Sequence, residues 1–416
     1  MKILLIHQNF PGQLRHIADD LKTRPDIDLL AVGRDTAPGL QGVRLLRYQP
    51  HRQPSRQAHP YLFSYEDAVL HGQAVLRSLQ PLARRGYRPD VILAHPGWGE
   101  TLFLKDLFPD ARLIHYCEFF YHGRGADADF DPEFPLSLDG AARLRARNAL
   151  HLLNLENADA GICPTHWQHS LHPAAYRDKL QVAHEGIRAE LLRPAPNAEL
   201  TLPNGRTLRA GQKIVTYVAR NLEPYRGFHV FMRALPELLR AEPDCQVVIV
   251  GGDGVSYGSA PADAANWREK LLRENPVDPN RVHFLGKVPY DVYRKVLQVS
   301  AVHVYLTYPF VLSWSLLEAM ASGCRIVASD TAPLREVIRD GVNGQLTDFF
   351  DREALIGRVV AALQEDDPAM RERARLTAAR YGVGQGVAAY RNLLGVDVSD
   401  AAGETAARGS DVLLRQ

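Results

Sequence analysis

The chain has 416 residues, of which 46% are hydrophobic and 23% are charged, and its formal net charge at pH 7 is +1. This is the composition of a globular protein long enough for two hydrophobic cores, and the balanced charge excludes bulk nucleic-acid binding as its main role. The cysteines, Cys117, Cys163, Cys245 and Cys324, are scattered without a Cys-x-x-Cys pair, which argues against a zinc site or a disulfide framework. We therefore expect a protein of a reducing, cytoplasmic compartment.

The first half of the chain alternates short apolar runs with longer helical patterns. Its first run, residues 2–7, is too short for a signal peptide or a membrane span, so we expect a buried strand there. Strands separated by helices predict a parallel, doubly wound sheet. The predicted strands cover Ile3 to Ile6, Leu29 to Val32, Val91 to Ala94, Leu113 to Tyr116, and Ala160 to Cys163.

Two charged stretches in this half are expected to lie on the surface. Residues 44–59, with Arg47 and Arg52 among them, form a basic loop that is either solvated or in contact with an anionic lipid surface or a diphosphate-linked acceptor. Residues 127–131 contain two overlapping Asp-x-Asp patterns typical of metal sites. Because they follow the flexible sequence Gly-Arg-Gly, we interpret them as an acceptor loop or a solvated acidic run.

Several functional side chains follow the predicted strands. His115 ends the fourth strand and faces the expected cleft, where it is either a binding residue or a structural histidine. His95 follows the third strand, and with Trp98 and Glu100 it is expected to shape the acceptor side of a site. Glu118, just beyond His115, is assigned to the same side.

The second half repeats the plan of alternating strands and helices. Between the halves, residues 193–197 are rich in proline, and polar residues continue to about Gly211, which predicts a linker. The active site is expected in the cleft between the two sheets, beyond the carboxyl ends of their strands. The predicted strands cover Ile214 to Val218, Val247 to Val250, Val282 to Phe284, Val302 to Leu306, Ile326 to Ala328, and Gln345 to Leu346.

Two arginines and two glycine turns follow strands of these sheets. Arg220 and Arg226 lie six residues apart after the strand at 214–218, where two planar guanidinium groups can clamp a diphosphate. Gly12 follows the first strand, and a glycine turn at 251–254 follows the strand at 247–250. Because neither turn is a Gly-x-Gly-x-x-Gly fingerprint, an NAD or FAD enzyme is disfavoured.

The segment 308–323 is the most informative part of the chain. It runs from an apolar loop into a helix that begins at Ser313 and carries one carboxylate, Glu318. The apolar residues of the helix form one stripe, and Glu318 lies off it, where we expect it to reach a ligand. The helix N-terminus beside it suits a phosphate. A solvated surface glutamate is the plain alternative.

The order of these features resembles a retaining glycosyltransferase of family four, a family that uses nucleotide sugars. Similarity covers nearly the whole chain and is denser in the second half. The resemblance implies the GT-B fold, in which two Rossmann-like α/β domains face a central cleft. The matching residues are Arg220, Arg226-Gly227, Gly251 to Gly254, Phe284-Leu285-Gly286, and Phe310 to Gly323.

The resemblance also implies residue roles. Arg220 and Arg226 would neutralise the leaving diphosphate, Glu318 would hold the ribose, and His115 would orient the sugar. The family's other glutamate falls on Phe310, so the carboxylate that usually touches the sugar is missing. The implied donor-binding set is Gly12, Gly252, Gly254, Gly286, Lys287, Phe310, Val311, Leu312 and Ser313, and the acceptor side has His95, Trp98 and Glu118.

The domain organisation that follows has four parts. Residues 1–195 are expected to bind the acceptor and residues 205–384 the nucleotide sugar. Residues 385–397 are expected to form a helix that crosses back over the cleft, and residues 398–416 to form a flexible tail.

We therefore predict a cytoplasmic glycosyltransferase that uses a nucleotide sugar, most often a UDP-sugar in this family, and a glycan or lipid-linked acceptor. No metal cofactor is expected, because arginines and helix dipoles supply positive charge. Peripheral contact with the inner face of a membrane is left open. The alternatives are a nucleotide-sugar epimerase on the same fold and a non-catalytic nucleotide-sugar-binding subunit, which the missing glutamate at 310 would favour.

Overall fold

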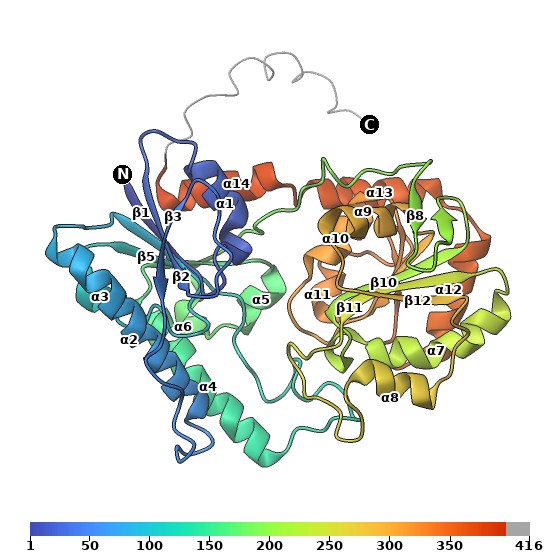
Figure 1. The fold of residues 1–416 in the computed structure, drawn as a ribbon, viewed down its shortest axis with the longest axis horizontal. Coiled ribbons are helices and arrows are strands. Elements are labelled where there is room, and N and C mark those ends of the chain that lie inside the picture. Colours follow the sequence, from blue (N-terminus) through green and yellow to red (C-terminus); the bar gives the residue numbers. More distant parts are fainter. Residues whose placement is uncertain (397–416) are drawn as a thin grey trace.

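The computed structural model describes residues 1–396, so the predicted tail at 398–416 lies outside the described residues. Two α/β domains lie side by side, each with helices around a parallel sheet (Figure 1). The two parallel sheets confirm the predicted pair of doubly wound α/β domains.

The N-terminal domain is built on a seven-stranded parallel sheet in the order β3-β2-β1-β4-β5-β6-β7. Because the chain leaves β1 to one side and returns with β4 on the other, the switch point lies between these two strands. The strands are β1 Lys2–Ile6, β2 Asp28–Arg34, β3 Arg44–Tyr48, β4 Val91–Ala94, β5 Arg112–Tyr116, β6 Ala160–Cys163 and β7 Leu180–Val182. The helices are η1 Gly12–Leu14, α1 Arg15–Leu21, α2 Phe63–Arg84, α3 Leu104–Leu107, α4 Leu138–Asn157, α5 His166–Leu171 and α6 Ala174–Arg177.

The prediction of a loop over all of residues 44–59 is wrong for its first part. Residues 44–48 form the edge strand β3, which pairs in parallel with β2. Tyr48 is buried, whereas Arg44 and Arg47 are exposed. Charged residues are typical of an edge strand, where one side of the backbone lacks a partner strand. Because two of its five residues are arginines, the strand was not recognised from its hydrophobic pattern.

The C-terminal domain has a six-stranded parallel sheet in the order β12-β11-β10-β13-β14-β15. Each of its strands lies where the apolar runs predict one. The strands are β10 Ile214–Asn221, β11 Gln246–Gly252, β12 Val282–Gly286, β13 Val302–Tyr305, β14 Arg325–Ser329 and β15 Gln345–Thr347. The helices are η2 Pro224–Arg226, α7 Phe228–Ala241, α8 Trp267–Glu274, α9 Tyr290–Val299, α10 Trp314–Ala321, α11 Ala332–Arg335, α12 Arg352–Gln364 and α13 Pro368–Ala379.

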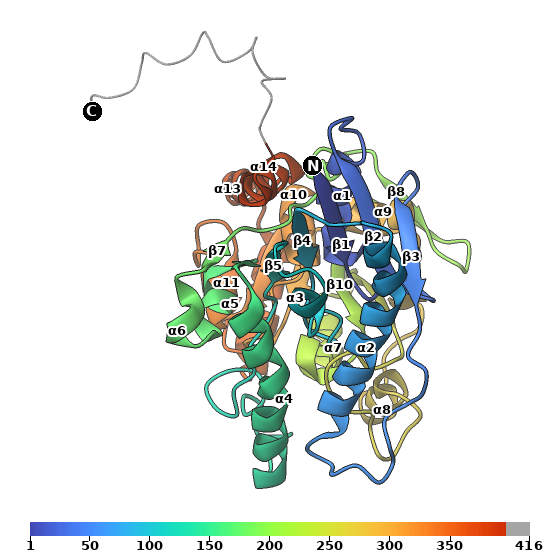
Figure 2. The same ribbon diagram turned by 90° about the vertical axis from the view of Figure 1, so that its left-hand side faces the viewer.

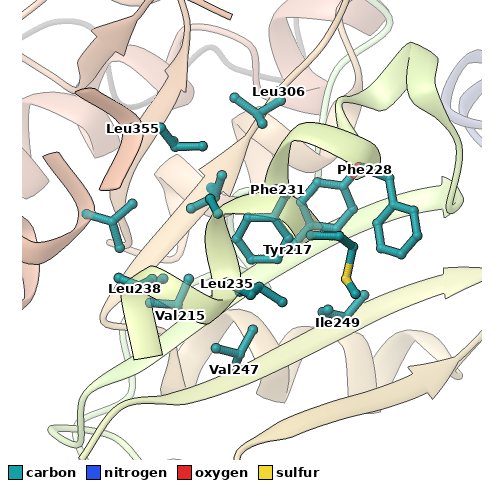
Figure 3. Packing of buried hydrophobic residues seen from close by; sticks show 14 of the residues in the cluster. Val215, Tyr217, Phe228, Phe231, Leu235, Leu238, Val247, Ile249, Leu306 and Leu355 are labelled. Atoms are coloured by element: carbon teal, nitrogen blue, oxygen red, sulfur yellow. The ribbon is translucent and has the colours of Figure 1, made fainter. Parts of the chain in front are cut away.

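The core of the C-terminal domain lies between α7 and the sheet (Figure 3). Phe231 of α7 stacks on Tyr217 of β10 with ring centroids 4.9 Å apart, and both side chains are almost completely buried. Burying aromatic side chains of this size stabilises a fold by roughly 1.5–3 kcal/mol each. Gly227, at the start of α7, has φ +68°, and a Cβ there would lie 2.3 Å from Leu306 Cβ, so only glycine fits.

The predicted linker is not wholly irregular. It contains the antiparallel hairpin β8 Glu199–Thr201 and β9 Thr207–Arg209. Leu200 and Leu208 are buried on one face of the hairpin and pack in a cluster with Val296 of α9. The Asn204-Gly205 pair forms the turn, with Gly205 at φ +84°. Each strand has three residues, so the alternation of buried and exposed side chains is too short to be recognised in the sequence.

The last described helix, α14 Val383–Leu394, returns to the N-terminal domain. Val387, Tyr390 and Leu393 join the core cluster around β1 and α1, and Arg391 forms an ion pair with Asp20 of α1. In Figure 1, α13 lies over the C-terminal domain and α14 continues beside α1. The helices at the end of the chain therefore connect the two domains.

Candidate active site

A cavity of about 300 Å³ lies between the domains, at the carboxyl ends of β1, β4 and β5. This is the switch point of the N-terminal sheet, where open α/β sheets bind ligands. Its N-terminal wall includes Gln13, His95, Trp98, His115 and Glu118, and its C-terminal wall includes Arg220, Ser256, Tyr257 and Phe310.

A chain of hydrogen bonds fixes Glu118 from one side. The backbone N–H of Asn9 donates to His7 Nδ1 at 3.0 Å, so the ring hydrogen of His7 is on Nε2. His7 Nε2 donates to Gln13 Oε1 at 2.7 Å, and Gln13 Nε2 donates to Glu118 Oε1 at 3.0 Å. A Cβ at Gly12, where φ is +46°, would lie 2.3 Å from the ring of His7. Gly12 is therefore required for the packing of this ring.

His95 holds the other oxygen of Glu118. The backbone N–H of Gly97 donates to His95 Nδ1 at 3.1 Å, so His95 Nε2 carries the hydrogen and donates to Glu118 Oε2 at 3.4 Å. Trp98 stacks on His95 with centroids 4.3 Å apart. Burial opposes ionisation of Glu118, but the hydrogen bonds from His95 and Gln13 hold its pKa below the usual value. The cavity thus contains an oriented, ionised carboxylate.

Glu100 lies away from this cavity. Its side chain is completely buried, and its Oε1 accepts the hydroxyl of Tyr48 at 2.6 Å. Burial raises the pKa of Glu100 to about 7. The structure places it in the interior of the N-terminal domain, next to β3, and not on the acceptor side where it was expected.

His115 lies in the innermost wall of the cavity and has no exposed surface. Among residues 1–396, neither of its ring nitrogens has a hydrogen-bond partner. Burial, assisted by the charge of Lys179, lowers the pKa of His115 to about 3, so the ring is neutral at pH 7. Its proposed contact with a sugar remains a prediction.

Buried histidines should make the protein sensitive to acid. Burial lowers the pKa of His7, His115, His151 and His303 to about 3 in each case. The unfolded chain protonates its histidines near pH 6.5, so between pH 6.5 and 3 it binds more protons, and stability falls as pH falls. Each histidine contributes a slope of roughly 1.4 kcal/mol per pH unit in this window. Glu100, with a raised pKa, acts in the opposite direction.

We expect the melting temperature to be level above pH 7 and to fall steeply below pH 6. Thermal unfolding at several pH values measures this, and a His115→Asn variant should have a shallower slope. An unchanged melting temperature from pH 7.5 to 5 would show that these rings are not buried in the neutral form.

The two arginines that were predicted to act together differ in their exposure. Arg220 is exposed and lines the cavity. Arg226 is buried, and its Nη1 donates to Thr307 Oγ1 at 2.9 Å and to the carbonyl of Val311 at 3.1 Å. Arg226 therefore holds the loop that precedes α10. We therefore expect its removal to destabilise this loop, because the side chain supports the loop from inside.

Phe310 closes the cavity at the position of the family's glutamate. Its ring lies 4.6 Å from Phe119 and 4.8 Å from Tyr257, measured between centroids. Phe119 belongs to the N-terminal domain and Tyr257 to the C-terminal domain, so Phe310 packs between the domains. The backbone N–H of Ser313 donates to the Tyr305 hydroxyl at 3.1 Å and is already engaged. The amides of Val311 and Leu312 are the remaining candidates in this loop for contact with a ligand.

Glu318 is not the surface residue that the helical pattern predicts. Its side chain is 7% exposed, and it accepts hydroxyls from Tyr293 at 2.6 Å and Tyr290 at 3.2 Å. Burial raises its pKa, and the two tyrosine hydrogen bonds act against that rise. The correction has a simple cause: α9 covers the polar side of α10. A carboxylate has about four acceptor positions, so the two tyrosines leave about two of them unused.

The other residues of the predicted donor set lie at the ends of β11 and β12. A Cβ at Gly252 would lie 2.5 Å from Lys287 Cε, so the glycine allows this lysine to pack against the turn. Gly286 has φ +65° with open space beside it, and Gly254 lies near the side chain of Asn221. These residues lie at the carboxyl ends of β11 and β12, as Arg220 lies at the carboxyl end of β10. They do not line the cavity.

Two acids of the run at 127–131, Asp127 and Asp131, are buried, whereas Asp129 is exposed. Residues 123–137, which we name the interdomain strap, reach from the N-terminal to the C-terminal domain. Asp127 Oδ2 accepts the Tyr225 hydroxyl at 3.0 Å, and Asp131 Oδ2 accepts the Tyr308 hydroxyl at 2.6 Å and His229 Nε2 at 3.0 Å. The solvated alternative is wrong for Asp127 and Asp131, whose partners are distant in sequence and could not be seen in the local pattern, and the acceptor-loop alternative stays a prediction.

Asp131, Glu133 and His229 have ligand atoms within 4.8 Å of one another and could in principle hold a metal ion. Both oxygens of Glu133 accept the fork of Arg233, at 2.6 and 2.8 Å. The carboxylates of Asp131 and Glu133 thus already have partners, and we interpret the group as a connection between the domains.

Sequence reasoning missed Gln13, Tyr257 and Arg147, which also line the cavity. Gln13 follows Gly12 in the turn after β1, and its proximity to a strand end was the available signal. Nothing in the local sequence marks Tyr257 or Arg147, because their position depends on the approach of the other domain.

Comparison with known proteins gives consistent results for both domains. A family model described as Glycosyl transferase family 4 group matches residues 25–192, and one described as Glycosyl transferases group 1 matches residues 212–365. A phosphatidyl-myo-inositol mannosyltransferase of Mycolicibacterium smegmatis is 32% identical over 160 residues, which is 37% of each chain. A D-inositol 3-phosphate glycosyltransferase of Nocardia farcinica is 30% identical over 177 residues, 41% of this chain and 37% of that protein. The matched region thus spans well under half of these relatives.

Solved structures share the fold over nearly the whole chain. Sucrose-phosphate synthase from Thermosynechococcus elongatus has a TM-score of 0.70 and 19% identity, covering 95% of this chain and 100% of that one. HepE of Anabaena, solved in complex with UDP and glucose, has a TM-score of 0.66 and 16% identity, covering 95% of this chain and 99% of that one. Two doubly wound domains with a cavity between them define a protein of the GT-B class. The chain belongs to the family-four, group 1 type of glycosyltransferases.

No helix within residues 1–396 is long and apolar enough to cross a lipid bilayer.

Proposed function

We propose that the protein is a retaining, metal-independent transferase that moves a sugar from a nucleoside diphosphate to a glycan or lipid-linked acceptor. One observation carries this proposal: the anchored carboxylate of Glu118 and the guanidinium of Arg220 face the same cavity from opposite domains. A cation suits the departing diphosphate, and a carboxylate suits sugar hydroxyls. UDP is the nucleotide we favour, supported by the UDP complex of HepE, with GDP and dTDP as alternatives.

The sugar would occupy the cavity, with Glu118 contacting its hydroxyls in place of the glutamate that Phe310 replaces. Arg220 would neutralise the leaving diphosphate, together with the N-terminus of α10, which Ser313 caps. Arg226 would act indirectly by holding the loop. In this arrangement the acceptor attacks from the side of the leaving group, and the anomeric configuration is retained.

Glu318 would hold the ribose through its two remaining acceptor positions. We expect Glu318→Gln to weaken nucleotide binding by about tenfold, because charge-assisted hydrogen bonds contribute roughly 1.5–3 kcal/mol each. The variant should also melt below wild type, because the amide offers one acceptor oxygen where the carboxylate offers one to each tyrosine. Calorimetric titration and thermal unfolding measure the two effects.

Tyr293→Phe is the matched control for Glu318→Gln, since it removes a hydrogen bond to Glu318 but keeps the carboxylate. It should lower the melting temperature and leave nucleotide affinity nearly unchanged. If Glu318→Gln lowers only the melting temperature, Glu318 is structural and does not bind the ribose.

Activity should survive treatment with EDTA. The only ligand-type cluster found among residues 1–396 is Asp131, Glu133 and His229, and Arg233 already occupies Glu133. Turnover is to be measured before and after dialysis against EDTA, then with added Mn²⁺ or Mg²⁺. Loss with EDTA and recovery with Mn²⁺ would assign a metal to this cluster.

Release of nucleoside diphosphate separates the proposal from its alternatives. A transferase releases it in proportion to added acceptor, an epimerase converts the sugar without releasing it, and a binding subunit does neither. Lipid and glycan extracts, added to purified protein with a panel of nucleotide sugars, supply the acceptors. Conversion of the donor sugar without release, in the presence of every acceptor fraction, would establish the epimerase.

A further inference from the structure

A second, larger cavity of about 970 Å³ adjoins the first. Arg147 and Tyr257 line both, so the two spaces meet at these side chains. Helix α4 forms one wall of the second cavity, and the interdomain strap and residues 257–263 form the others. Figure 2 shows α2 and α4 extending below the N-terminal sheet, and the second cavity lies at their N-terminal ends.

The α4 wall carries two arginines without a carboxylate partner. Arg143 and Arg147 are four residues apart, so they share one face of the helix, where like charges repel. Within the described part of the chain, no carboxylate oxygen forms an ion pair with either side chain. The guanidinium of Arg147 lies 4.1 Å from the ring centre of Tyr121, which holds it in place. This pair is unbalanced positive charge on the wall of a cavity.

The acidic groups of the cavity are engaged elsewhere. Asp127 accepts the Tyr225 hydroxyl, and burial raises its pKa to about 6, against the influence of Arg147. Asp263 forms ion pairs with Lys270 and Arg273. Asp131, which also lines the cavity, accepts the Tyr308 hydroxyl and His229 Nε2. Asp127 thus offsets part of the charge of Arg147, but within residues 1–396 no carboxylate forms an ion pair with Arg143 or Arg147.

The rest of the wall is largely apolar. Aromatic rings and a leucine face the same space from both domains, and such surfaces pack against a sugar ring or a hydrocarbon chain. The residues are Tyr61, Phe63, Phe134, Leu144, Tyr225 and Trp267.

We infer that the acceptor is anionic and carries a phosphate ester, which Arg143 and Arg147 bind while its sugar or lipid part lies against the aromatic wall. This inference rests on the proposed function, because it takes the adjoining cavity as the donor-sugar site. Guanidinium forks match phosphate oxygens in pairs, and two of them on one helix face suit a dianion. With its phosphate bound at α4, the acceptor can extend past Arg147 and Tyr257, so that its hydroxyl group lies in the first cavity.

Calorimetric titration with small probes tests the inference without knowledge of the acceptor. Hexyl phosphate should bind at least tenfold more tightly than hexyl glucoside. Arg143→Gln, which changes only the second cavity, and the double variant Arg143→Gln/Arg147→Gln should each weaken hexyl phosphate binding, the double variant by tenfold or more. Arg145→Gln is the matched control, because Arg145 is exposed on the same helix and does not line the cavity. It should bind hexyl phosphate as wild type does.

Three results would overturn the inference: equal affinity for the phosphate and the glucoside, no loss in the double variant, or an equal loss in Arg145→Gln. Glycerol 1-phosphate distinguishes the sources of the phosphate. If it binds as tightly as hexyl phosphate, the acceptor is a free phosphate ester, and if it binds much more weakly, the acceptor is a lipid. Nucleotide binding, measured separately, should not change in Arg143→Gln or in Arg145→Gln, because neither arginine lines the first cavity. Failure of the donor-site proposal and failure of this one therefore give different results.

Discussion

The Arg226→Ala variant is expected to melt several degrees below wild type and to lose nearly all turnover. The buried guanidinium donates to the hydroxyls of Tyr305 and Thr307 and to the carbonyl of Val311. Hydrogen bonds from a charged group contribute roughly 1.5–3 kcal/mol each, and removal leaves buried oxygens without a donor. The loop before α10 should become mobile, and the donor site should be lost with it. Thermal unfolding and steady-state kinetics measure both effects.

Arg220→Ala is the control for Arg226→Ala. Arg220 is exposed on the cavity wall, so its removal should leave the melting temperature within a few degrees of wild type. Its kcat/KM should nevertheless fall, by an amount equivalent to about 2–4 kcal/mol, because the diphosphate loses a cation. If Arg226→Ala melts normally and Arg220→Ala is fully active, the assignment of both residues is wrong.

The Glu118→Gln variant should lower kcat/KM by about a hundredfold, in the range seen when one group that stabilises a transition state is removed. The substitution keeps the shape of the side chain but removes the charge that His95 and Gln13 orient. Nucleotide affinity should stay close to that of wild type, because only the sugar part of the donor contacts this residue. Kinetics and titration with the free nucleoside diphosphate give the two values.

Asp110→Asn provides the matched control for Glu118→Gln, since Asp110 is an exposed carboxylate just before β5. This variant should behave as wild type in both measurements. Full activity of Glu118→Gln would remove the observation on which the proposed function depends.

The sequence was sufficient to predict most of the sheets. Long apolar runs mark buried parallel strands, because both faces of such strands are covered by helices. It failed at β3, whose arginines lie on an exposed edge. It also failed at β7 and at the hairpin β8–β9, whose strands of three residues are too short to show a period. A strand that is short, or that buries only one face, has too few apolar residues for hydrophobic patterning to reveal it.

The site was predicted less well, because its contacts are between distant residues. Glu118 and His95 were identified from their positions after strands, and both reach the cavity. For Glu318, the tyrosines that bury it belong to another helix, so the periodicity of α10 alone could not reveal them. Asp131 likewise depends on His229 and Tyr308 of the other domain.

Thermal unfolding with a panel of nucleoside diphosphates and nucleotide sugars tests the central claim most directly. A ligand that binds only the folded state at about a hundred times its Kd stabilises it by roughly 2.7 kcal/mol. One nucleotide and its sugar derivatives, most simply those of uridine, should raise the melting temperature of wild type, and the increase should be smaller in Arg220→Ala. If no uridine, guanosine, adenosine or thymidine derivative raises the melting temperature of the cooperatively folded wild type, the protein is not a nucleotide-sugar-dependent transferase.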